Sequence, residues 1–137
     1  MSMIKLSYRD QAITGLPTMN IRINQRILTC EYAVSQDDRE TGLMHRNMLP
    51  WNRGMIFRTF GRYRPQFHMD NVRFNLEGIF VGNDMKIVDI IPMLKLDASS
   101  LYTTYKNIPI AWVIEANMGW GSRNNVGIGD RVFVGNF

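Results

Sequence analysis

Apolar and polar residues alternate along several short segments of the chain, and this pattern predicts half-buried β-strands. The alternation is clearest over residues 19–23, whereas residues 27–34 carry apolar groups on both rows and are expected inside the sheet. Residues 4–8 predict a short edge strand that Gly15-Leu16-Pro17 ends. Residues 85–91 are mainly apolar, with Lys86 and Asp89 as exceptions, and we expect burial on both faces up to Pro92. Further strands are expected at residues 55–57, 66–69, 74–81, 111–116 and 131–134.

One helix is expected, over about residues 36–46. The Ser35 hydroxyl can accept the backbone N–H of Asp38 in a capping box. Gly42 inside so short a helix predicts that another backbone packs closely on it. Several short strands, one helix and no regular alternation of strands with helices favour a mainly β domain. We expect either a small curled sheet or a β-barrel-like fold.

Composition narrows the class of protein. The length of 137 residues predicts a single domain, with residues 1–17 as an N-terminal extension. The net charge of +4 rests on twelve arginines and four lysines, which favours planar contacts to carboxylate or phosphate but is too modest for a nucleic-acid tail. The one cysteine, Cys30, excludes an intrachain disulfide and is expected as a buried thiol. No signal peptide and no run of ~20 apolar residues are found, so we expect a cytoplasmic location, or an assembly formed there such as a virion.

The segment from Phe67 to Phe80 mixes large apolar and polar side chains more densely than the rest of the chain. We expect two strands around a polar bend that lines a concave site. For Asn71 a structural role at a corner is favoured over a ligand contact, because asparagine tolerates left-handed backbone angles and bonds to free backbone groups at a bend. Residues 58–64 and 93–110 would form the rim of the cleft. The candidates for ligand binding in the cleft are Phe67, Met69, Asp70, Asn71 and Glu77.

Three carboxylates, Asp70, Glu77 and Glu115, would support general acid–base chemistry if they converged near a counter-charge. We favour a structural ion pair instead. Glu115 lies on a buried strand, and a lone buried carboxylate is costly, so Glu115 is expected to pair with Arg46 or Arg53.

The chain offers little for a metal or a cofactor. The two histidines, His45 and His68, lack metal-ligand spacing, and His68 with Asp70 makes an incomplete ligand set. The turn Gly127-Ile128-Gly129-Asp130 precedes a strand rather than a helix and lacks the lysine of a phosphate-binding loop. No metal and no cofactor are therefore predicted.

The segment after the strand at residues 55–57 is expected to be a loop that interleaves arginine with aromatic residues. Both residue types are enriched in protein–protein hot spots, and both serve single-stranded nucleic-acid sites. A solvated loop with one aromatic anchor is a third interpretation. Protein contact ranks above nucleic acid, because the net charge is modest and no nucleic-acid motif is present. The residues of this interaction loop are Arg58, Phe60, Arg62, Tyr63 and Arg64.

Six short blocks occur in an order that resembles one protein family, and together they cover about residues 27–134. They are Gly42-Leu43-Met44 with Arg46, Gly54-Met55-Ile56-Phe57, Phe67 with Met69 and Asn71, Leu76-Glu77 with Ile79-Phe80, Val113-Ile114-Glu115, and Gly127-Ile128-Gly129-Asp130. The chain resembles the domain of unknown function 192 family of bacterial, archaeal and phage proteins.

The resemblance implies a compact β-barrel-like domain with one short helix and no established enzymatic activity. Many members look secreted, and this chain departs from them because it lacks a leader, while phage-encoded members make a viral setting plausible. The chain also departs inside the central block. His68 to Val72 stand where the family usually has Trp-Met-Lys-Asn-Thr, and Asn75 and Glu77 stand where it has Pro and Asp. The aromatic wall, the lysine and the threonine of a family cleft are thus replaced.

These observations favour a non-enzymatic binding or protein-interaction module of unknown ligand. A structural or accessory subunit of a larger assembly, such as a phage particle, is the alternative. A hydrolase-like enzyme that uses Asp70, Glu77 or Glu115 is the second alternative. A protein partner is preferred, a small ligand comes next, nucleic acid ranks lower, and no membrane contact is predicted. The oligomeric state is left open.

Overall fold

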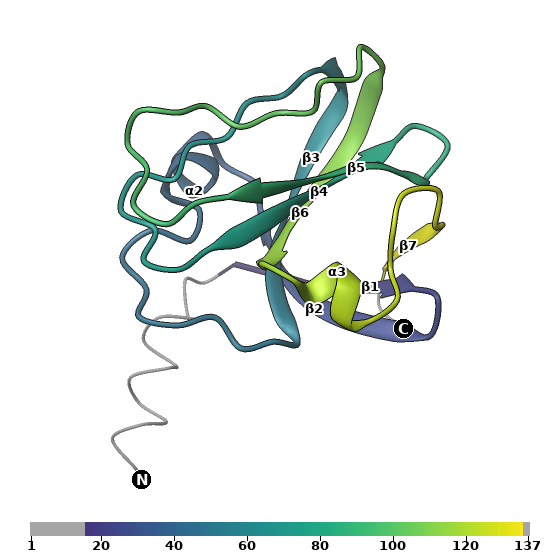
Figure 1. The fold of residues 1–137 in the computed structure, drawn as a ribbon, viewed down its shortest axis with the longest axis horizontal. Helices are drawn as coiled ribbons and strands as arrows, with labels where there is room; N and C mark the ends of the chain where they lie inside the picture. The colour runs from purple at the N-terminus through teal and green to yellow at the C-terminus, as the bar shows by residue number, and fades with distance from the viewer. Residues whose placement is uncertain (1–15, 136–137) are drawn as a thin grey trace, which may run out of the picture.

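Seven strands form one sheet in the computed structural model, which describes residues 16–135 (Figure 1). The sheet order is β5-β4-β6-β3-β2-β1-β7. The mainly β fold expected from the sequence is confirmed, and the strand expected at residues 4–8 lies outside the described residues. The strands are β1 (Thr18–Ile23), β2 (Arg26–Ala33), β3 (Arg53–Tyr63), β4 (Leu76–Gly82), β5 (Ile87–Met93), β6 (Pro109–Asn117) and β7 (Val132–Gly135), and the helices are α2 (Gln36–Thr41) and α3 (Trp120–Arg123).

The sheet curls until its two outer strands approach each other. A single bridge pairs Lys86, just before β5, with Arg131, just before β7. The Ile87 N–H next to it donates to the Asp130 carbonyl over 2.9 Å. Neighbouring strands are antiparallel except β2 and β3, which run parallel and are joined through α2. No ladder joins β5 to β7 within the described residues, so the fold is a curled, barrel-like sheet that stays open.

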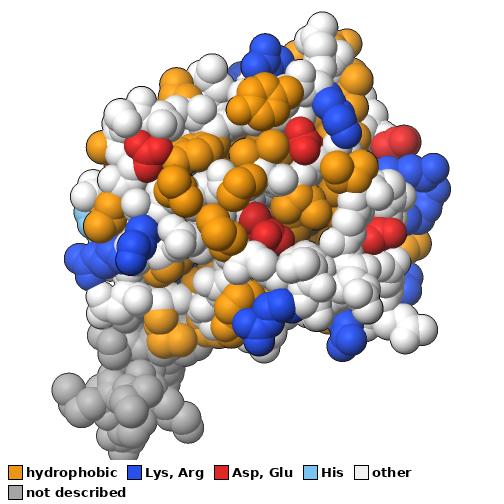
Figure 2. Space-filling model, in the orientation of Figure 1, with side chains coloured by type: hydrophobic (Ala, Val, Ile, Leu, Met, Phe, Trp, Pro, Cys, Tyr) orange, Lys and Arg blue, Asp and Glu red, His pale blue; other side chains and the backbone are white. Residues whose placement is uncertain are grey.

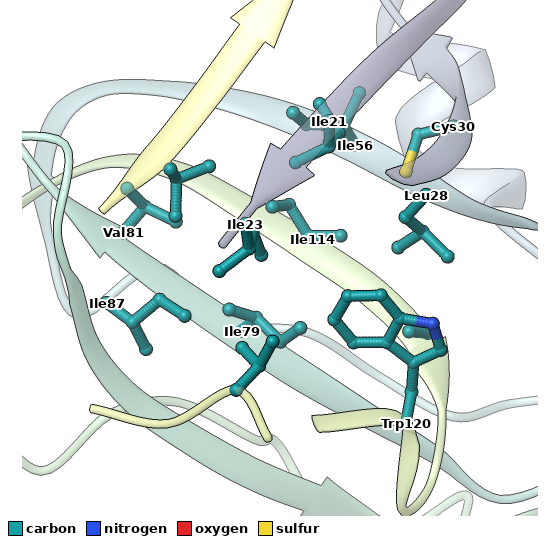
Figure 3. Close-up of a cluster of buried hydrophobic side chains, with 13 residues drawn as sticks. Ile21, Ile23, Leu28, Cys30, Ile56, Ile79, Val81, Ile87, Ile114 and Trp120 are labelled. Atoms are coloured by element: carbon teal, nitrogen blue, oxygen red, sulfur yellow. The ribbon is translucent and has the colours of Figure 1, made fainter. Parts of the chain in front are cut away.

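One face of the sheet forms the larger hydrophobic core (Figure 3). Residues two apart on a strand point to the same face, and most of these alternate positions are apolar, with Glu77 of β4 as an exception. Trp120 of α3 packs against this core. Cys30 is fully buried there, and burial raises the pKa of its thiol, as expected of a core cysteine. The buried members are Ile21, Ile23, Leu28, Cys30, Ile56, Ile79, Val81, Ile87, Ile114, Ala116, Trp120, Val126 and Val132.

The opposite face carries a second core beneath α2 and the segment before β4. Phe67 lies against it, with its ring centroid 5.2 Å from that of Phe57 and 6.1 Å from that of Phe80, both edge-on. Phe67 also exchanges two backbone hydrogen bonds with Tyr102, which fixes the 93–110 connection to this face. The buried members are Ala33, Leu43, Leu49, Met55, Phe57, Met69, Val72, Leu76 and Met93.

The strand register puts two glutamates on one row of this second face. β2 pairs Glu31 with Met55, and β6 pairs Glu115 with both Met55 and Gly78. Directly paired residues point to the same face, so Glu31 and Glu115 flank the Met55 side chain in the buried row. The neighbouring Gly54 allows β3 to approach β6 closely, because a Cβ at that position would lie 2.5 Å from the Glu115 carbonyl oxygen.

Arg46 forms a buried ion pair with Glu31. Its Nη1 lies 2.5 Å from Glu31 Oε2 and its Nη2 lies 3.1 Å from Oε1, so the pair is bidentate. The two side chains are only 6% and 4% exposed. The predicted pairing of Arg46 with Glu115 is therefore wrong. The register places Glu31 on the same buried row, on the strand that leads into α2, and Glu31 takes the guanidinium.

Helix α2 begins as the sequence predicts and ends earlier. The Asp38 N–H donates to the Ser35 hydroxyl over 3.0 Å, and the Asp38 carboxylate accepts the Ser35 N–H, so the capping box is confirmed. Gly42 has φ +49°, which ends the helix at Thr41 instead of Arg46. A Cβ at Gly42 would meet only the Arg39 carbonyl oxygen, at 3.8 Å, so the expected close packing of another segment is wrong. The residues around Trp120 form one helical turn.

Strand β3 is much longer than residues 55–57 and absorbs most of the predicted interaction loop. Its pairing with β6 continues from Arg58–Trp112 to Arg62–Ile110 across a bulge. Phe60 has φ +54° and Gly61 has φ +77°, which accommodates the extra residues. The prediction of a loop from residue 58 was therefore wrong, because a bulge interrupts the alternation without ending the strand.

The central segment is one strand after an irregular corner, where two strands were expected. Residues 66–69 contribute only the bridge between Phe67 and Tyr102, and β4 begins at Leu76. The prediction for β5 needs two corrections: most of its residues are half-buried, and Pro92 lies inside it. β5 is an edge strand, and an edge strand tolerates proline because one row of its N–H groups has no partner strand.

The face seen in Figure 2 has hydrophobic side chains over its middle and arginine and lysine side chains toward its margin. Positive charge is dispersed on this face rather than gathered into the stripe that is typical of nucleic-acid binding. Over residues 16–135, none of the helices has the length and apolar character needed to span a bilayer.

Arg46→Met should destabilise the protein by about 3–5 kcal/mol, because it leaves the Glu31 carboxylate buried without its guanidinium. Urea denaturation measures the loss. Arg73→Met, at an exposed arginine bonded to Asn47, is the matched control and should cost less than about 1 kcal/mol. Adding Glu31→Gln to Arg46→Met should restore part of the stability. Equal losses in the Arg46 and Arg73 variants would contradict the assignment.

Candidate functional site

A cavity of about 400 Å³ lies between α2, the second half of β3 and residues 65–68. This volume falls in the range of small-molecule sites. Side chains from four separate parts of the chain meet there, so the site exists only in the folded sheet. The lining residues are Gln36, Arg39, Glu40, Thr41, Gly42, Leu43, Met44, Phe57, Arg58, Thr59, Phe60, Arg62, Pro65, Gln66, Phe67, His68, Val72 and Glu115.

The walls of the cavity are apolar. Leu43 and Val72 are buried, and Phe57 and Phe67 present their rings in an edge-on arrangement. All four belong to or pack on the second core, so these walls are fixed by core packing rather than by mobile surface side chains. Such walls suit the apolar body of a small organic molecule.

Glu115 lies at the buried end of the cavity. It is 5% exposed, and no hydrogen bond or ion pair joins its carboxyl to another described residue. Its oxygens are not among the fully enclosed polar atoms that lack a partner, because they face the cavity. Burial raises the pKa of Glu115 to about 8, and no neighbouring charge offsets that effect. The carboxyl is therefore largely protonated at neutral pH and can donate its proton to a hydrogen-bond acceptor.

The charged groups near Glu115 belong either to the neighbouring ion pair in the sheet or to the lining of the cavity. The Arg46–Glu31 pair lies on the same row of the sheet, beyond Met55. The remaining charged or titratable side chains line the cavity on α2, β3 and the 65–68 segment: Arg39, Glu40, Arg58, Arg62 and His68. None of these described side chains is in hydrogen-bond contact with Glu115.

The mouth of the cavity is basic. Arg39 Nη1 donates to the Arg58 carbonyl over 2.8 Å, which ties α2 to β3. Arg62 lines the mouth from β3, whereas the Arg58 guanidinium turns away and lies 5.5 Å from the centroid of the Trp112 ring, which packs against the larger core on the opposite face. His68 Nε2 lies 3.0 Å from the Glu40 carbonyl oxygen, which holds the imidazole against the end of α2.

Of the predicted cleft residues, only Phe67 lines this cavity. Met69 is fully buried in the second core. Asp70 is half-buried, and its backbone N–H donates to His68 Nδ1 over 3.2 Å. Asn71 is exposed with φ +58°, and its carbonyl accepts the His45 N–H over 3.0 Å. These positions form a structural corner, the role that the sequence favours for Asn71.

Glu77 lies on the opposite face of the sheet from Glu115, because the two strands pair Glu77 with Ala116 and Gly78 with Glu115. Its carboxylate accepts the Gly119 and Gly121 N–H groups, each over 2.8 Å, and so anchors the start of α3. Asp70, Glu77 and Glu115 therefore do not converge, in agreement with the preference for a structural role over acid–base chemistry. The side-chain period of two on a strand separates Glu77 from the cavity.

The predicted interaction loop is divided. Arg58, Phe60 and Arg62 line the cavity. Tyr63 is 55% exposed at the end of β3, and Arg64 Nε donates to the Thr104 carbonyl over 3.1 Å. The 93–110 connection was expected at the rim and contributes no residue to the lining.

Sequence reasoning missed the contribution of α2 and the turn that follows it. Arg39, Glu40 and Thr41 lie on a polar helix whose pattern is typical of an ordinary solvated face. The parallel pairing of β2 with β3 is what lays this helix over the cavity. One sequence signal was available: Glu31 and Glu115 each interrupt a strongly apolar strand, and such interruptions commonly mark a special environment.

The described residues hold no group of three or more histidine, cysteine or acidic side chains that could bind a metal ion.

Comparison of the sequence with protein-family models agrees with the fold described above. A family model described as an uncharacterized ACR, domain of unknown function 192, matches residues 19–134. The chain belongs to this family. The match confirms the resemblance that the six sequence blocks suggested.

Two solved structures are similar to this chain. A protein of unknown function from Novosphingobium aromaticivorans has a TM-score of 0.80 and 26% identity, with 88% of each chain covered. A protein named as a candidate transcription regulator from Sinorhizobium meliloti has a TM-score of 0.76 and 28% identity, covering 87% of this chain and 95% of its own. No curated protein matches the chain significantly. The family and fold are thus shared, while the function of the family is not established by these relatives.

The protein should lose stability as the pH rises from about 5 to about 9. The pKa of Glu115 is 4.5 in its ordinary environment and about 8 in the folded protein, so the folded state holds a proton that the unfolded state has released. The resulting stabilisation is fully present below the lower value and is lost as the pH passes the higher one. At about 1.4 kcal/mol per pKa unit the loss amounts to several kcal/mol.

Glu115→Gln should flatten this profile, because the amide stays neutral throughout the range. Glu40→Gln, at an exposed position of α2, is the control and should leave the slope unchanged. Urea denaturation at a series of pH values measures both. A Glu115→Gln variant with the slope of the wild type would refute the assignment of a protonated carboxyl.

Proposed function

We propose that this protein is a non-enzymatic binding domain that holds a small organic ligand in the cavity between α2 and β3. The unpaired Glu115 carboxyl at the buried end of that cavity carries the proposal. A buried polar group without a partner costs free energy, and a ligand that bonds to it would recover part of that cost. The apolar walls and the volume of about 400 Å³ fit the same interpretation.

Binding fits the geometry better than hydrolysis. General acid–base catalysis with carboxyl groups needs a second ionised group near the first. Glu77 is on the other face and is bonded to two backbone amides, and Asp70 does not line the cavity. Within the described residues, Glu115 is the one buried carboxyl that the cavity contains.

A protein-interaction role, including that of an accessory subunit of a phage particle, is the second candidate. Phe60 is 75% exposed and Tyr63 is 55% exposed at the far end of β3, where a partner could cover them. This candidate places the protein in the cytoplasm or in a virion. The name of the Sinorhizobium relative would add DNA as a partner, but the dispersed positive charge of the face in Figure 2 does not favour it.

Thr41→Trp should block the binding of small ligands, because Thr41 is exposed and lines the mouth of the cavity. A thermal-shift screen with anionic, neutral and cationic metabolites identifies ligands, and titration calorimetry measures them. We expect the affinity to fall at least about tenfold in Thr41→Trp and to stay unchanged in Asn107→Trp, an exposed position outside the cavity.

Ligands that bind both tryptophan variants as tightly as the wild type would refute the proposed site. No binding from any chemical class, together with native mass spectrometry that finds no small molecule on the protein from its source, would refute the proposed function. A partner that is lost in Tyr63→Ala while the ligand shift persists would instead support the second candidate.

A further inference from the structure

The cavity has three zones of different chemistry, and their order determines which ligand it suits. The mouth is basic, the middle is apolar and aromatic, and the buried end carries a single carboxyl. Resting on the proposed function, we infer that the ligand is a small organic anion with an apolar body, whose carboxylate or phosphate lies between Arg39 and Arg62 and whose opposite end accepts a hydrogen bond from Glu115.

The mouth favours an anion because its arginines outnumber its acids. Arg39 and Arg62 line it against the one carboxylate of Glu40. The Gln36 amide donates to Glu40 over 2.9 Å, so part of the capacity of that carboxylate is taken up along the helix. Two cations at one opening attract an anion and concentrate it at the entrance.

One of the two arginines is held in place before any ligand arrives. Arg39 is half-buried and uses one of its N–H donors on the Arg58 carbonyl, and its guanidinium lies 6.0 Å from the Phe57 ring centroid. The Arg58 guanidinium takes no part, because it lies over the Trp112 ring, which packs against the larger core on the opposite face of the sheet. A guanidinium has five N–H donors, so the contacts of Arg39 leave donors for a carboxylate or a phosphate. Preorganisation of this kind lowers the entropic cost of binding.

The buried end suits a neutral acceptor. Glu115 has no partner among the described residues, and its carboxyl keeps its proton at neutral pH because burial raises its pKa to about 8. A protonated carboxyl donates to a carbonyl, ether or hydroxyl oxygen. An ammonium group would need Glu115 to lose that proton and would have to pass two arginines, so a cationic inner end is the less favourable occupant.

A matched set of rigid probes tests each zone separately by calorimetry on the full chain. Para-acetylbenzoate and para-acetylphenyl phosphate combine an anion, a ring and a carbonyl, and they distinguish a carboxylate source from a phosphate source. Para-ethylbenzoate lacks the acceptor, para-acetylbenzamide lacks the charge, and para-acetylbenzylamine reverses it. The same five groups on a longer biphenyl skeleton extend the test to longer ligands.

In the wild type, one of the two acetyl anions should bind about tenfold more tightly than the ethyl, amide and amine probes on the same skeleton. Glu115→Leu should remove the preference for acetyl over ethyl, and Glu115→Gln, which can still donate, should keep it. Arg62→Gln should weaken the anions and spare the amide, whereas Arg131→Gln, exposed and outside the cavity, should change neither. The affinity for the acetyl anions should also fall as the pH rises past about 8, where Glu115 loses the proton that it donates.

Tighter binding of the benzylamine, or affinity for the anions that rises with pH, would overturn the inference in favour of a cationic ligand. Anion binding that is unaffected by Arg62→Gln and Glu115→Leu would overturn it as well. If neutral or cationic compounds bind and Thr41→Trp blocks them, the proposed function stands and only the ligand class is wrong. If no probe on either skeleton binds and the wider metabolite screen is also empty, both are wrong.

Discussion

One buried cation has to serve three buried carboxylates in this fold. Among the described residues, Arg46 is the only basic side chain in the buried set, which contains Glu31, Glu77 and Glu115. Each carboxylate meets its desolvation cost in a different way. Glu31 takes the guanidinium, Glu77 takes two backbone N–H groups at the start of α3, and Glu115 keeps its proton. The sheet register decides this distribution, because it sets which carboxylate faces which side.

The distribution separates structure from candidate function. The Glu31 carboxylate accepts hydrogen bonds from Arg46, and the Glu77 carboxylate accepts them from two backbone N–H groups. These bonds hold α2, β2 and α3 in place, so both carboxylates have a structural role. Glu115 has the same side chain and a comparable burial but faces the cavity. Close approach of β3 to β6 at Gly54 keeps that strand pairing tight beneath it. A rigid scaffold thus presents one unsatisfied carboxyl at the end of an apolar pocket, which is the arrangement that binding sites require.

Local signals predicted the parts of the fold that depend on local chemistry. The capping box of α2, the buried Cys30 and most strands followed from residues within a few positions of each other. Helix length failed because the conformation of Gly42 depends on the turn into the second core, and β3 failed because a bulge at Phe60 and Gly61 breaks the period without breaking the pairing.

The candidate site was harder to predict for a physical reason. Phe67 and Glu115 were identified, but Arg39 and Thr41 reach the cavity only because β2 and β3 are parallel and α2 crosses between them. Partner choice was equally hidden, since the sequence offers Arg46 twelve acidic residues and only the register selects Glu31. The alternation of side chains along β4 could have predicted the position of Glu77. Gly78 pairs with Glu115, and Glu77 is the next residue on the strand, so the Glu77 side chain points to the other face of the sheet.

The positions at which the chain departs from the pattern implied by its resemblance bear on the proposed site. His68 and Val72 line the cavity, at positions where the resemblance implies tryptophan and threonine. The cationic character of the mouth comes from α2 and β3, through Arg39 and Arg62, and not from the segment between His68 and Val72. The walls made by core residues are apolar. Under the proposed function, the few polar groups around these walls would set the specificity, because an apolar frame alone discriminates little between ligands.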